Sequence, residues 1–356
     1  MTALRGPVLV VGTGMLGTSI GLACRRAGLE VLLADISHDH VRTASGLGAG
    51  RPVAPGDSPQ LVVVAVPPDH LGEVLVRVLS ETDAVVTDVG SIKSRPLHEV
   101  REAVGPEQLR RYVGSHPMAG SERSGPLAAS AVLFDGRPWA VTAHENADPA
   151  ATALVEELAV RCGADLVRLP PGEHDQAVAR TSHLPHLLAV LVAGQLAEAP
   201  VTHLALSGQG VRDVTRVAGS DPALWQQIVT ANAYAVLELL GQVRGELDDL
   251  ITAVSTGERE ALGVLLDRGV AGTHAIPGKH GGPVRATASV FVSVPDHPGE
   301  LARLFADAGA SEVNIEDVHI DHDPGRDTGL VELVVTAGTA GRLSTSLESR
   351  GWVTHG

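Results

Sequence analysis

A short apolar run followed by three regularly spaced glycines constrains the fold of this chain most strongly. Val8–Val11 is rich in β-branched residues, and Gly12, Gly14 and Gly17 then form the pattern G-x-G-x-x-G before a segment with helical apolar spacing. Such glycines permit a tight turn and the close approach of a pyrophosphate, which the free N–H groups of a helix N-terminus bind. The strand before and the helix after favour a dinucleotide-binding unit over an ordinary glycine-rich turn.

A carboxylate ends the second apolar run, Glu30–Ala34, and bears on the choice of dinucleotide. Asp35 stands where a carboxylate accepts hydrogen bonds from the adenosine ribose hydroxyls and would repel a 2′-phosphate. The residues between Asp35 and Arg42 include no Arg or Lys. We therefore predict NAD rather than NADP as cofactor, with a solvated turn residue as the alternative for Asp35. The predicted cofactor-binding residues are Gly12, Thr13, Gly14, Met15, Leu16, Gly17, Asp35, Val66 and Pro67.

More apolar runs alternate with helical patterns over the first part of the chain. Leu61–Val66, Ala84–Thr87 and Trp139–Thr142 have the composition of strands, and Tyr112–Gly114 leads into a polar segment around His116. Apolar runs without alternation are typical of parallel strands that helices cover on both faces. The order of the patterns therefore predicts an α/β domain with an open parallel sheet of the Rossmann type.

The pattern changes after Leu169-Pro170-Pro171-Gly172. Residues 173–266 have helical spacing and predict an all-α domain, whose long apolar helices exceed what a thin domain buries alone and so predict a partner copy. Farther on, Ala288–Val294 alternates with period two and begins a βαββα pattern, which predicts a small α+β module. The predicted domains are residues 1–170 and 171–273, a Gly/Pro-rich linker over 274–285, and the module over 286–356.

Composition excludes several classes of partner. The net charge of −15 argues against nucleic acid and anionic membranes, and no apolar stretch approaches the ~20 residues of a membrane span. The N-terminus does not have the pattern of a signal peptide. Cys24 and Cys162 have no metal spacing and form no disulfide framework, so we expect a cytoplasmic protein with a small-molecule substrate.

Polar groups with catalytic potential gather in three later segments. The first, residues 114–125, sets His116 among glycines, hydroxyls and charged groups, and the third, residues 211–225, carries two arginines. Between them, His183 and His186 lie three positions apart, on one face of a helix. A metal site is a rival interpretation of these two histidines, but no third ligand follows at suitable spacing, so we predict no metal.

Together with Asp-Val-Gly-Ser-Ile-Lys at residues 88–93, these segments resemble the prephenate dehydrogenase family, which includes arogenate dehydrogenases. Gly-Ser-His-Pro-Met-Ala-Gly and Ser-His-Leu-Pro-His carry the resemblance, which covers residues 8 to about 265. It implies a Rossmann-type domain, a dimerising helical domain and a homodimer. It also implies NAD-dependent oxidative decarboxylation of prephenate to 4-hydroxyphenylpyruvate in tyrosine biosynthesis. Arogenate as substrate is the alternative, and the choice between the two depends on whether the pocket meets a keto or an amino group.

The resemblance also implies roles for individual residues. His116 would accept the substrate hydroxyl proton, Ser91 would contact the hydroxyl region, and Arg216 would bind a carboxylate. Ser91 as the N-cap of a helix beginning at Ile92, and Arg216 in a surface ion pair with Asp213 or Asp221, remain as structural alternatives. Arg212 stands where relatives carry lysine. The predicted catalytic residues are His116 and Ser91, and the predicted substrate-binding residues are Arg216, His186, His183, Arg212, Glu122 and Ser115.

The end of the chain resembles an ACT domain, a ferredoxin-like module that commonly pairs and binds an amino acid at the pairing edge. Residues 294–305 and 313–318 carry this resemblance. It implies that tyrosine is an effector and that Asp296, Pro298, Gly299 and Asn314 are regulatory residues. A dimerisation element without a ligand is the alternative.

Two other functions compete with a prephenate or arogenate dehydrogenase. A β-hydroxyacid or 6-phosphogluconate-type dehydrogenase would need a catalytic lysine in the helical domain, and residues 173–268 contain no lysine. A non-catalytic sensor of NAD and an amino acid would bind both ligands without turnover, and its His116 would be dispensable.

Overall fold

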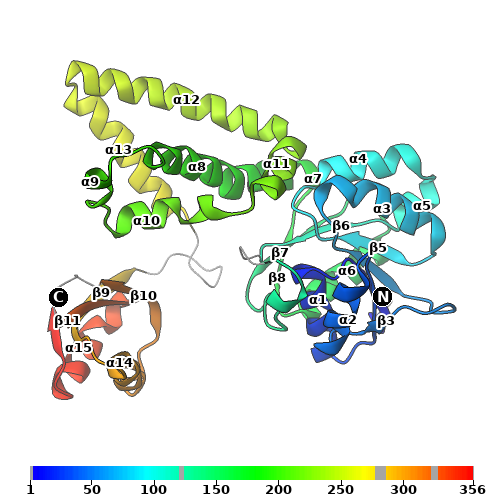
Figure 1. Cartoon of the computed structure of the whole chain (residues 1–356), viewed down its shortest axis with the longest axis horizontal. Coiled ribbons are helices and arrows are strands. Elements are labelled where there is room, and N and C mark those ends of the chain that lie inside the picture. The colour runs from blue at the N-terminus through cyan, green and yellow to red at the C-terminus, as the bar shows by residue number, and fades with distance from the viewer. Residues whose placement is uncertain (1–2, 120–123, 277–285, 322–327, 356) are drawn as a thin grey trace. The chain divides into compact units, whose positions relative to one another are not determined.

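The computed structural model describes residues 3–119, 124–276, 286–321 and 328–355 (Figure 1). The chain divides into two compact units, residues 1–246 and residues 247–356, and each is described by itself. Glu122 and most of the predicted linker lie outside the described residues.

A five-stranded parallel sheet begins the first unit, in the order β3-β2-β1-β4-β5. Its strands are β1 (Val8–Val11), β2 (Val31–Ala34), β3 (Arg51–Pro52), β4 (Leu61–Val64) and β5 (Val85–Asp88). Its helices are α1 (Met15–Arg26), α2 (His38–Gly46), α3 (Pro68–Glu81), α4 (Ser94–Ala103), α5 (Pro106–Arg110) and α6 (Pro149–Arg161). Strand order reverses between β1 and β4, and ligands of open α/β sheets bind at the carboxyl ends of the strands at such a point. This is the doubly wound arrangement that the apolar runs predict.

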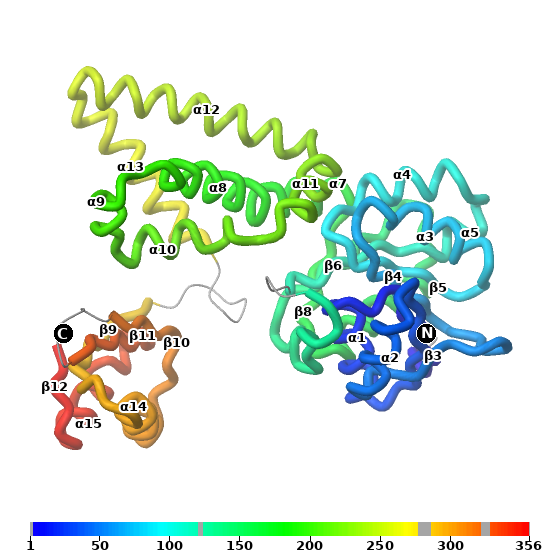
Figure 2. Tube along the Cα trace, in the orientation of Figure 1, coloured from blue at the N-terminus to red at the C-terminus, as the bar shows by residue number. Residues whose placement is uncertain are grey.

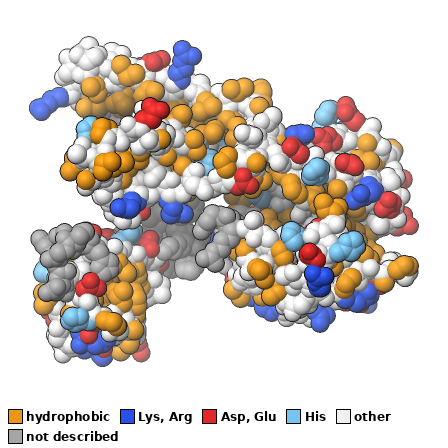
Figure 3. Space-filling model, in the orientation of Figure 1, with side chains coloured by type: hydrophobic (Ala, Val, Ile, Leu, Met, Phe, Trp, Pro, Cys, Tyr) orange, Lys and Arg blue, Asp and Glu red, His pale blue; other side chains and the backbone are white. Residues whose placement is uncertain are grey.

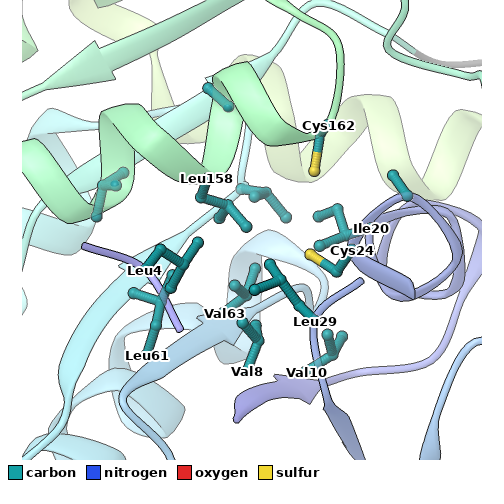
Figure 4. Close-up of a cluster of buried hydrophobic side chains, with 14 of the residues drawn as sticks. Leu4, Val8, Val10, Ile20, Cys24, Leu29, Leu61, Val63, Leu158 and Cys162 are labelled. Carbon is teal, nitrogen blue, oxygen red and sulfur yellow. The ribbon is translucent and has the colours of Figure 1, made fainter. Parts of the chain in front are cut away.

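The inner strands β1, β2 and β4 are buried or half-buried on both faces because they carry only apolar side chains. One face packs with α1 and α6 in a cluster that includes Val8, Leu61 and Val63 (Figure 4). The opposite face buries Val62 and Val64 beside α3. Alternate residues of β4 thus enter different cores, as the two-residue period of a strand requires.

Three further strands form a separate sheet, β6 (Gly114–Pro117), β7 (Pro138–Thr142) and β8 (Asp165–Arg168). β6 and β7 are antiparallel, with His116 opposite Ala140. The prediction that residues 139–142 continue the parallel sheet is therefore wrong. Within the described residues, the connection contains one 3₁₀ turn, Pro126–Ala128, and no crossover helix that could return the chain in parallel.

Helices fill the chain from residue 171 to 274, as the spacing predicts. They are α7 (Pro171–Val178), α8 (Leu184–Leu196), α9 (Val201–Leu204), α10 (Gln209–Thr215), α11 (Pro222–Ala231), α12 (Ala233–Thr256) and α13 (Arg259–His274). The π turn η2 (Ala179–His183) joins α7 to α8, and the 3₁₀ turn η3 (Arg216–Gly219) precedes α11. Large apolar side chains remain exposed on this part, Leu191 of α8 among them, and they form hydrophobic areas in Figure 3.

The module at the end of the chain has one more strand than predicted (Figure 2). It comprises β9 (Thr287–Pro295), α14 (Glu300–Gly309), β10 (Ile315–Asp321), β11 (Thr328–Thr336), α15 (Ala340–Ser349) and β12 (Val353–His355). The sheet order is β10-β11-β9-β12, and all pairs are antiparallel. This βαββαβ topology is ferredoxin-like. The predicted βαββα pattern omits β12, which is three residues long and too short to show a period.

Candidate active site

The glycine turn after β1 has the shape that the fingerprint predicts. Gly12 has φ of +98°, and a Cβ there would lie 2.4 Å from the Ala65 carbonyl oxygen. A Cβ at Gly17 would lie 1.9 Å from the Gly12 carbonyl oxygen, whereas a Cβ at Gly14 would meet nothing within 4 Å. Two glycines therefore allow close backbone packing, and the third leaves the start of α1 open to a phosphate.

Asp35 is held beside this turn at the end of β2. Its Oδ2 accepts hydrogen bonds from the Thr13 N–H at 2.6 Å and the Thr13 hydroxyl at 2.9 Å, and its Oδ1 accepts from the Ser37 N–H at 2.8 Å. Partial burial alone would raise the pKa of Asp35, but these hydrogen bonds lower it below its ordinary value. A fixed, ionised carboxylate therefore stands at the place where the sequence predicts a ribose contact.

The other predicted cofactor residues surround the same turn. Met15 and Leu16 begin α1 and are half-buried. The Val66 side chain lies 3.2 Å from the position of a Cβ on Gly12, and Pro67 is the N-cap of α3. The structure thus brings the predicted cofactor residues together at the carboxyl ends of β1, β2 and β4.

His116 lies within β6 and meets a second histidine from α7. Its Nδ1 is 2.9 Å from Nε2 of His174, and the two ring centroids are 5.1 Å apart at 67°. Burial lowers the pKa of His116 well below its ordinary value, and the nearby His174, Lys93 and His183 lower it further. His116 is therefore neutral at neutral pH and able to accept a proton.

Asp175 follows His174 and links α7 to the N-terminus of α4. Its Oδ1 accepts from the Lys93 N–H and its Oδ2 from the Ser94 N–H, both at 2.8 Å. Since α4 begins at Ser94, the interpretation of Ser91 as the N-cap of a helix from Ile92 is wrong, and the Asp175 carboxylate binds these helix N–H groups instead. Ser91 lies half-buried in the turn between β5 and α4.

A second buried polar cluster lies behind His116. The Lys93 ammonium contacts the Asp88 carboxylate and donates to the Ser115 carbonyl oxygen at 2.7 Å, while the Tyr112 hydroxyl donates to Asp88 at 2.8 Å. The Ser115 hydroxyl donates to the Asp88 carbonyl oxygen at 2.8 Å and accepts from Thr87. Ser115 is fully buried, and successive strand side chains point to opposite faces. Its hydroxyl is thus turned away from His116, contrary to the predicted substrate contact.

The two predicted histidines of the helical segment meet at a tryptophan. His186 stacks on Trp225 with ring centroids 3.4 Å apart, and His183 meets the same ring edge-on at 6.0 Å. The Val217 backbone hydrogen-bonds to the His186 ring, which brings η3 and its first residue, Arg216, beside this cluster. Burial lowers the pKa of His183 to about 4, so both histidine rings contribute as neutral, polar groups.

Arg212 in α10 and Arg216 at the start of η3 have exposed side chains. In the part of the chain that the structure describes, Arg216 forms no ion pair with Asp213 or Asp221. Asp213 accepts a hydrogen bond from Gln209 at 2.8 Å, and Asp221 caps α11 through the Ala223 N–H at 2.9 Å. The Arg216 guanidinium therefore remains available for a carboxylate.

Several residues of this site escape prediction from the sequence. His174, Asp175 and Asn232 connect the two groups of histidines, since Asn232 donates to the Asp175 carbonyl oxygen at 2.8 Å and lies 3.2 Å from His183 Nδ1. The adjacent His-Asp pair at 174–175 is the only local signal, and nothing in the sequence indicates that it faces His116. Among the described residues, no group of three or more His, Cys, Asp or Glu is placed to hold a metal ion.

The predicted regulatory residues lie at two ends of the module. Asp296 and Pro298 are exposed in the turn after β9, and Gly299 caps α14 with φ of +96°. Asn314 precedes β10. The first residue of β10 pairs with Val335 of β11, which pairs with Ala288 at the start of β9, whereas the other three residues follow the end of β9. One copy of the module therefore does not bring Asn314 to the other three residues.

Comparison with known proteins places the chain in a family. The model of the prephenate dehydrogenase nucleotide-binding domain matches residues 20–168, and that of the prephenate dehydrogenase dimerization domain matches residues 170–268. A probable prephenate dehydrogenase of Streptomyces niveus is 38% identical over 97% of this chain and 98% of its own length. The chain belongs to the prephenate dehydrogenase family. The resemblance read from the sequence is therefore confirmed, as are the Rossmann-type sheet and the helical domain after it.

Solved structures of this family have the same fold. Prephenate dehydrogenase from Aquifex aeolicus, in complex with hydroxyphenyl propionate and NAD⁺, aligns with a TM-score of 0.68 at 26% identity, covering 78% of this chain and 99% of that one. Arogenate dehydrogenase from Synechocystis aligns with a TM-score of 0.65 at 27% identity, covering 75% and 98%. None of the described helices is long and apolar enough to cross a membrane.

Proposed function

We propose that the chain catalyses the NAD-dependent oxidative decarboxylation of prephenate to 4-hydroxyphenylpyruvate, in tyrosine biosynthesis. The observation that carries this proposal is His116, a half-buried and neutral imidazole that contacts His174 of α7 at 2.9 Å. Such a group accepts a proton at neutral pH, which a dehydrogenase needs when it oxidises a hydroxyl-bearing carbon.

NAD is the cofactor that the site and the family support. The open backbone at Gly14 and the fixed Asp35 carboxylate suit a pyrophosphate and a ribose. The family has a nucleotide-binding domain, and the Aquifex relative binds NAD⁺. When bound, NAD⁺ supplies a hydride acceptor for the ring carbon that bears the substrate hydroxyl.

The residues of the chain position the substrate and remove one proton. His116 takes the hydroxyl proton as hydride leaves the ring carbon. The bond to the ring carboxylate then breaks, and its electrons enter the ring as carbon dioxide departs. Aromatisation drives this step, so positioning is the main task of the protein. Ser91 would contact the hydroxyl region from the turn before α4.

A cationic anchor is essential because the chain carries a net charge of −15. Arg216 offers a planar fork for a substrate carboxylate, and Arg212 adds positive charge one helical turn earlier. His183, His186 and Trp225 form one wall of rings beside this anchor. The proposed pocket therefore lies between His116 and η3.

Arogenate is the second candidate substrate, because an arogenate dehydrogenase has the same fold at similar identity. The two substrates differ in a keto or an amino group on the side chain. The Streptomyces niveus relative, which is 38% identical, is named a probable prephenate dehydrogenase, and this favours prephenate.

The test is an assay of both substrates, each with NAD and with NADP. We expect the highest kcat/KM for prephenate with NAD, and a loss of roughly 10²- to 10⁴-fold in His116→Asn. Higher kcat/KM for arogenate would refute the proposed substrate. Binding of NAD without turnover of either substrate would favour the sensor, and full activity of His116→Asn would refute the proposed base.

We further propose that the C-terminal module is an ACT-like sensor of tyrosine and that the enzyme is a cytoplasmic homodimer with the domain limits given above. The ferredoxin-like topology and the dimerization-domain match support this organisation. Since Asn314 lies far along the sheet from Asp296 and Gly299, a tyrosine site that uses all of them requires two paired modules.

A further inference from the structure

A buried pair on α7 contacts the proposed base and has no role in the function proposed above. His174 is 1% exposed and Asp175 is 5% exposed. Nε2 of His174 is 2.9 Å from Nδ1 of His116, and Nδ1 of His174 is 2.9 Å from Oδ1 of Asp175. Each ring nitrogen of His174 thus has one partner within the described chain.

The ionisation state of Asp175 decides which ring nitrogens of His174 and His116 carry a proton. Burial alone would raise the pKa of Asp175, but hydrogen bonds from His174, Ser94 and Lys93 lower it. Asp175 is therefore ionised and can only accept hydrogen bonds, so Nδ1 of His174 carries a proton. A neutral His174 then presents a lone pair at Nε2, and Nδ1 of His116 must donate to it.

We propose that His174, held by Asp175, is a positioning residue that fixes His116 in the tautomer with its proton on Nδ1. The Nε2 atom of His116 is then the one that accepts the substrate hydroxyl proton. This inference rests on the proposed function, in which His116 is the base. Once Nε2 is protonated, the Asp175 charge stabilises the imidazolium through the His174 ring, as a carboxylate does in other histidine-based sites.

Several hydrogen bonds hold Asp175 in place, so the hydrogen-bonded series of Asp175, His174 and His116 is rigid. The Lys93 and Ser94 N–H groups bind its carboxylate, and Asn232 binds its carbonyl oxygen. The same contacts join α7 to the turn that carries Ser91. His174 is thereby positioned relative to the nucleotide-binding domain and not only to its own helix.

In the alternative assignment, both ring nitrogens of His174 carry a proton. His174 is then a cation, and its Nε2 donates to Nδ1 of His116. Among the described residues, the charged or titratable groups facing His116 are His174, Lys93 and His183, with Asp88 on the far side of Lys93 and Asp175 behind His174. That assignment would place a second cation near His116, whose neighbourhood already contains the buried Lys93 ammonium. Neutral His174 therefore fits this environment better.

A matched pair of variants tests the role of the His174 Nε2 position. In His174→Gln the side-chain oxygen reaches the place of Nε2 and can accept from His116. In His174→Asn the amide reaches only the place of Nδ1, near Asp175. With prephenate and NAD, we expect His174→Gln to keep kcat within about fivefold of the wild type, and His174→Asn to lose roughly 10²-fold in kcat. The KM for prephenate and the Kd for NAD should change little in either variant.

Equal kcat in the two variants, or a loss confined to KM, would overturn the proposal. A measurement on the wild type keeps it testable if a variant does not fold. In protein labelled with ¹⁵N-histidine, the ring nitrogen shifts report which atom carries the proton, and the spectrum of His116→Asn identifies the His116 signals. We expect an unprotonated Nε2 at neutral pH, and a proton on that atom would refute the inference. Full turnover by His116→Asn would instead refute the base itself, so the two failures are distinguishable.

Discussion

At the scale of single residues, burial decides what the histidines of this enzyme can do. His116 and His183 both have lowered pKa values because the packing around their rings disfavours the charged form, and the pKa of His183 falls to about 4. Both are therefore neutral when the surrounding solvent is near neutral pH. An exposed histidine with an ordinary pKa would be partly protonated there and a less complete acceptor.

The lowered pKa of His116 predicts the shape of the pH–rate profile. The neutral, accepting form persists as the pH falls below the ordinary value of 6.5, so the acid limb of kcat/KM should lie below pH 6.5. Measurement of kcat/KM for prephenate across the acid and neutral range checks this. The residual activity of His116→Asn should lack that limb, and a limb at or above pH 6.5 would contradict the assignment.

The lowered pKa of His183 predicts that the free energy of unfolding changes with pH. Its pKa is about 4 in the folded chain and 6.5 in the unfolded one, so the unfolded chain binds more protons between these values. The free energy of unfolding should therefore decrease as the pH falls from 6.5 towards 4. Thermal melts at several pH values should show a smaller decrease in Tm for His183→Gln. The slope should not vanish, because the pKa values of His116, His144 and His186 are lowered too.

At the scale of elements, two short segments set the geometry. The turn from β1 to α1 places open backbone at the carboxyl edge of the sheet. The strand β6 directs His116 to one side and the hydroxyl of Ser115 to a buried network on the other. The backbone conformation of each element sets the direction in which its groups point, and this decides which of them reach the site.

The glycine turn predicts different effects for two similar substitutions. Gly17→Ala would drive a Cβ against the Gly12 carbonyl oxygen, so it should destabilise the fold by at least about 2 kcal/mol. Gly14→Ala meets nothing within 4 Å, so the Tm should be nearly unchanged. A methyl group there obstructs the approach of a phosphate, and the Kd for NAD should rise at least about tenfold. Calorimetry of both variants with and without NAD tests this, and unchanged NAD binding by Gly14→Ala would place the pyrophosphate elsewhere.

At the scale of the whole molecule, the chain combines the two domains of its family with a ferredoxin-like module. The family models cover residues 20–168 and 170–268, and the ferredoxin-like module lies beyond them. A module with its own core, as in Val292, Leu304 and Leu347, can fold around a ligand site that is separate from the reaction.

Tyrosine inhibition is the prediction at this scale. If the module senses tyrosine, inhibition should be lost in Asn314→Ala and in a chain without residues 286–356, while activity without tyrosine remains. A tyrosine titration of initial rates on all three proteins measures this. Equal inhibition of the three would show that tyrosine acts elsewhere, for example by competing at the active site.

The sequence by itself determined the elements that depend on local pattern. The fingerprint, the apolar runs and the helical spacing set the strands and helices, because backbone and burial preferences act over a few residues. They also sufficed for the family, since the polar segments around His116 and His183 occur in order. Only the tertiary structure decided the antiparallel return of β7, the fourth strand of the module and the inward turn of Ser115. It alone brought His174 and Asp175 to His116, because a contact between residues 58 positions apart depends on packing that no local pattern encodes.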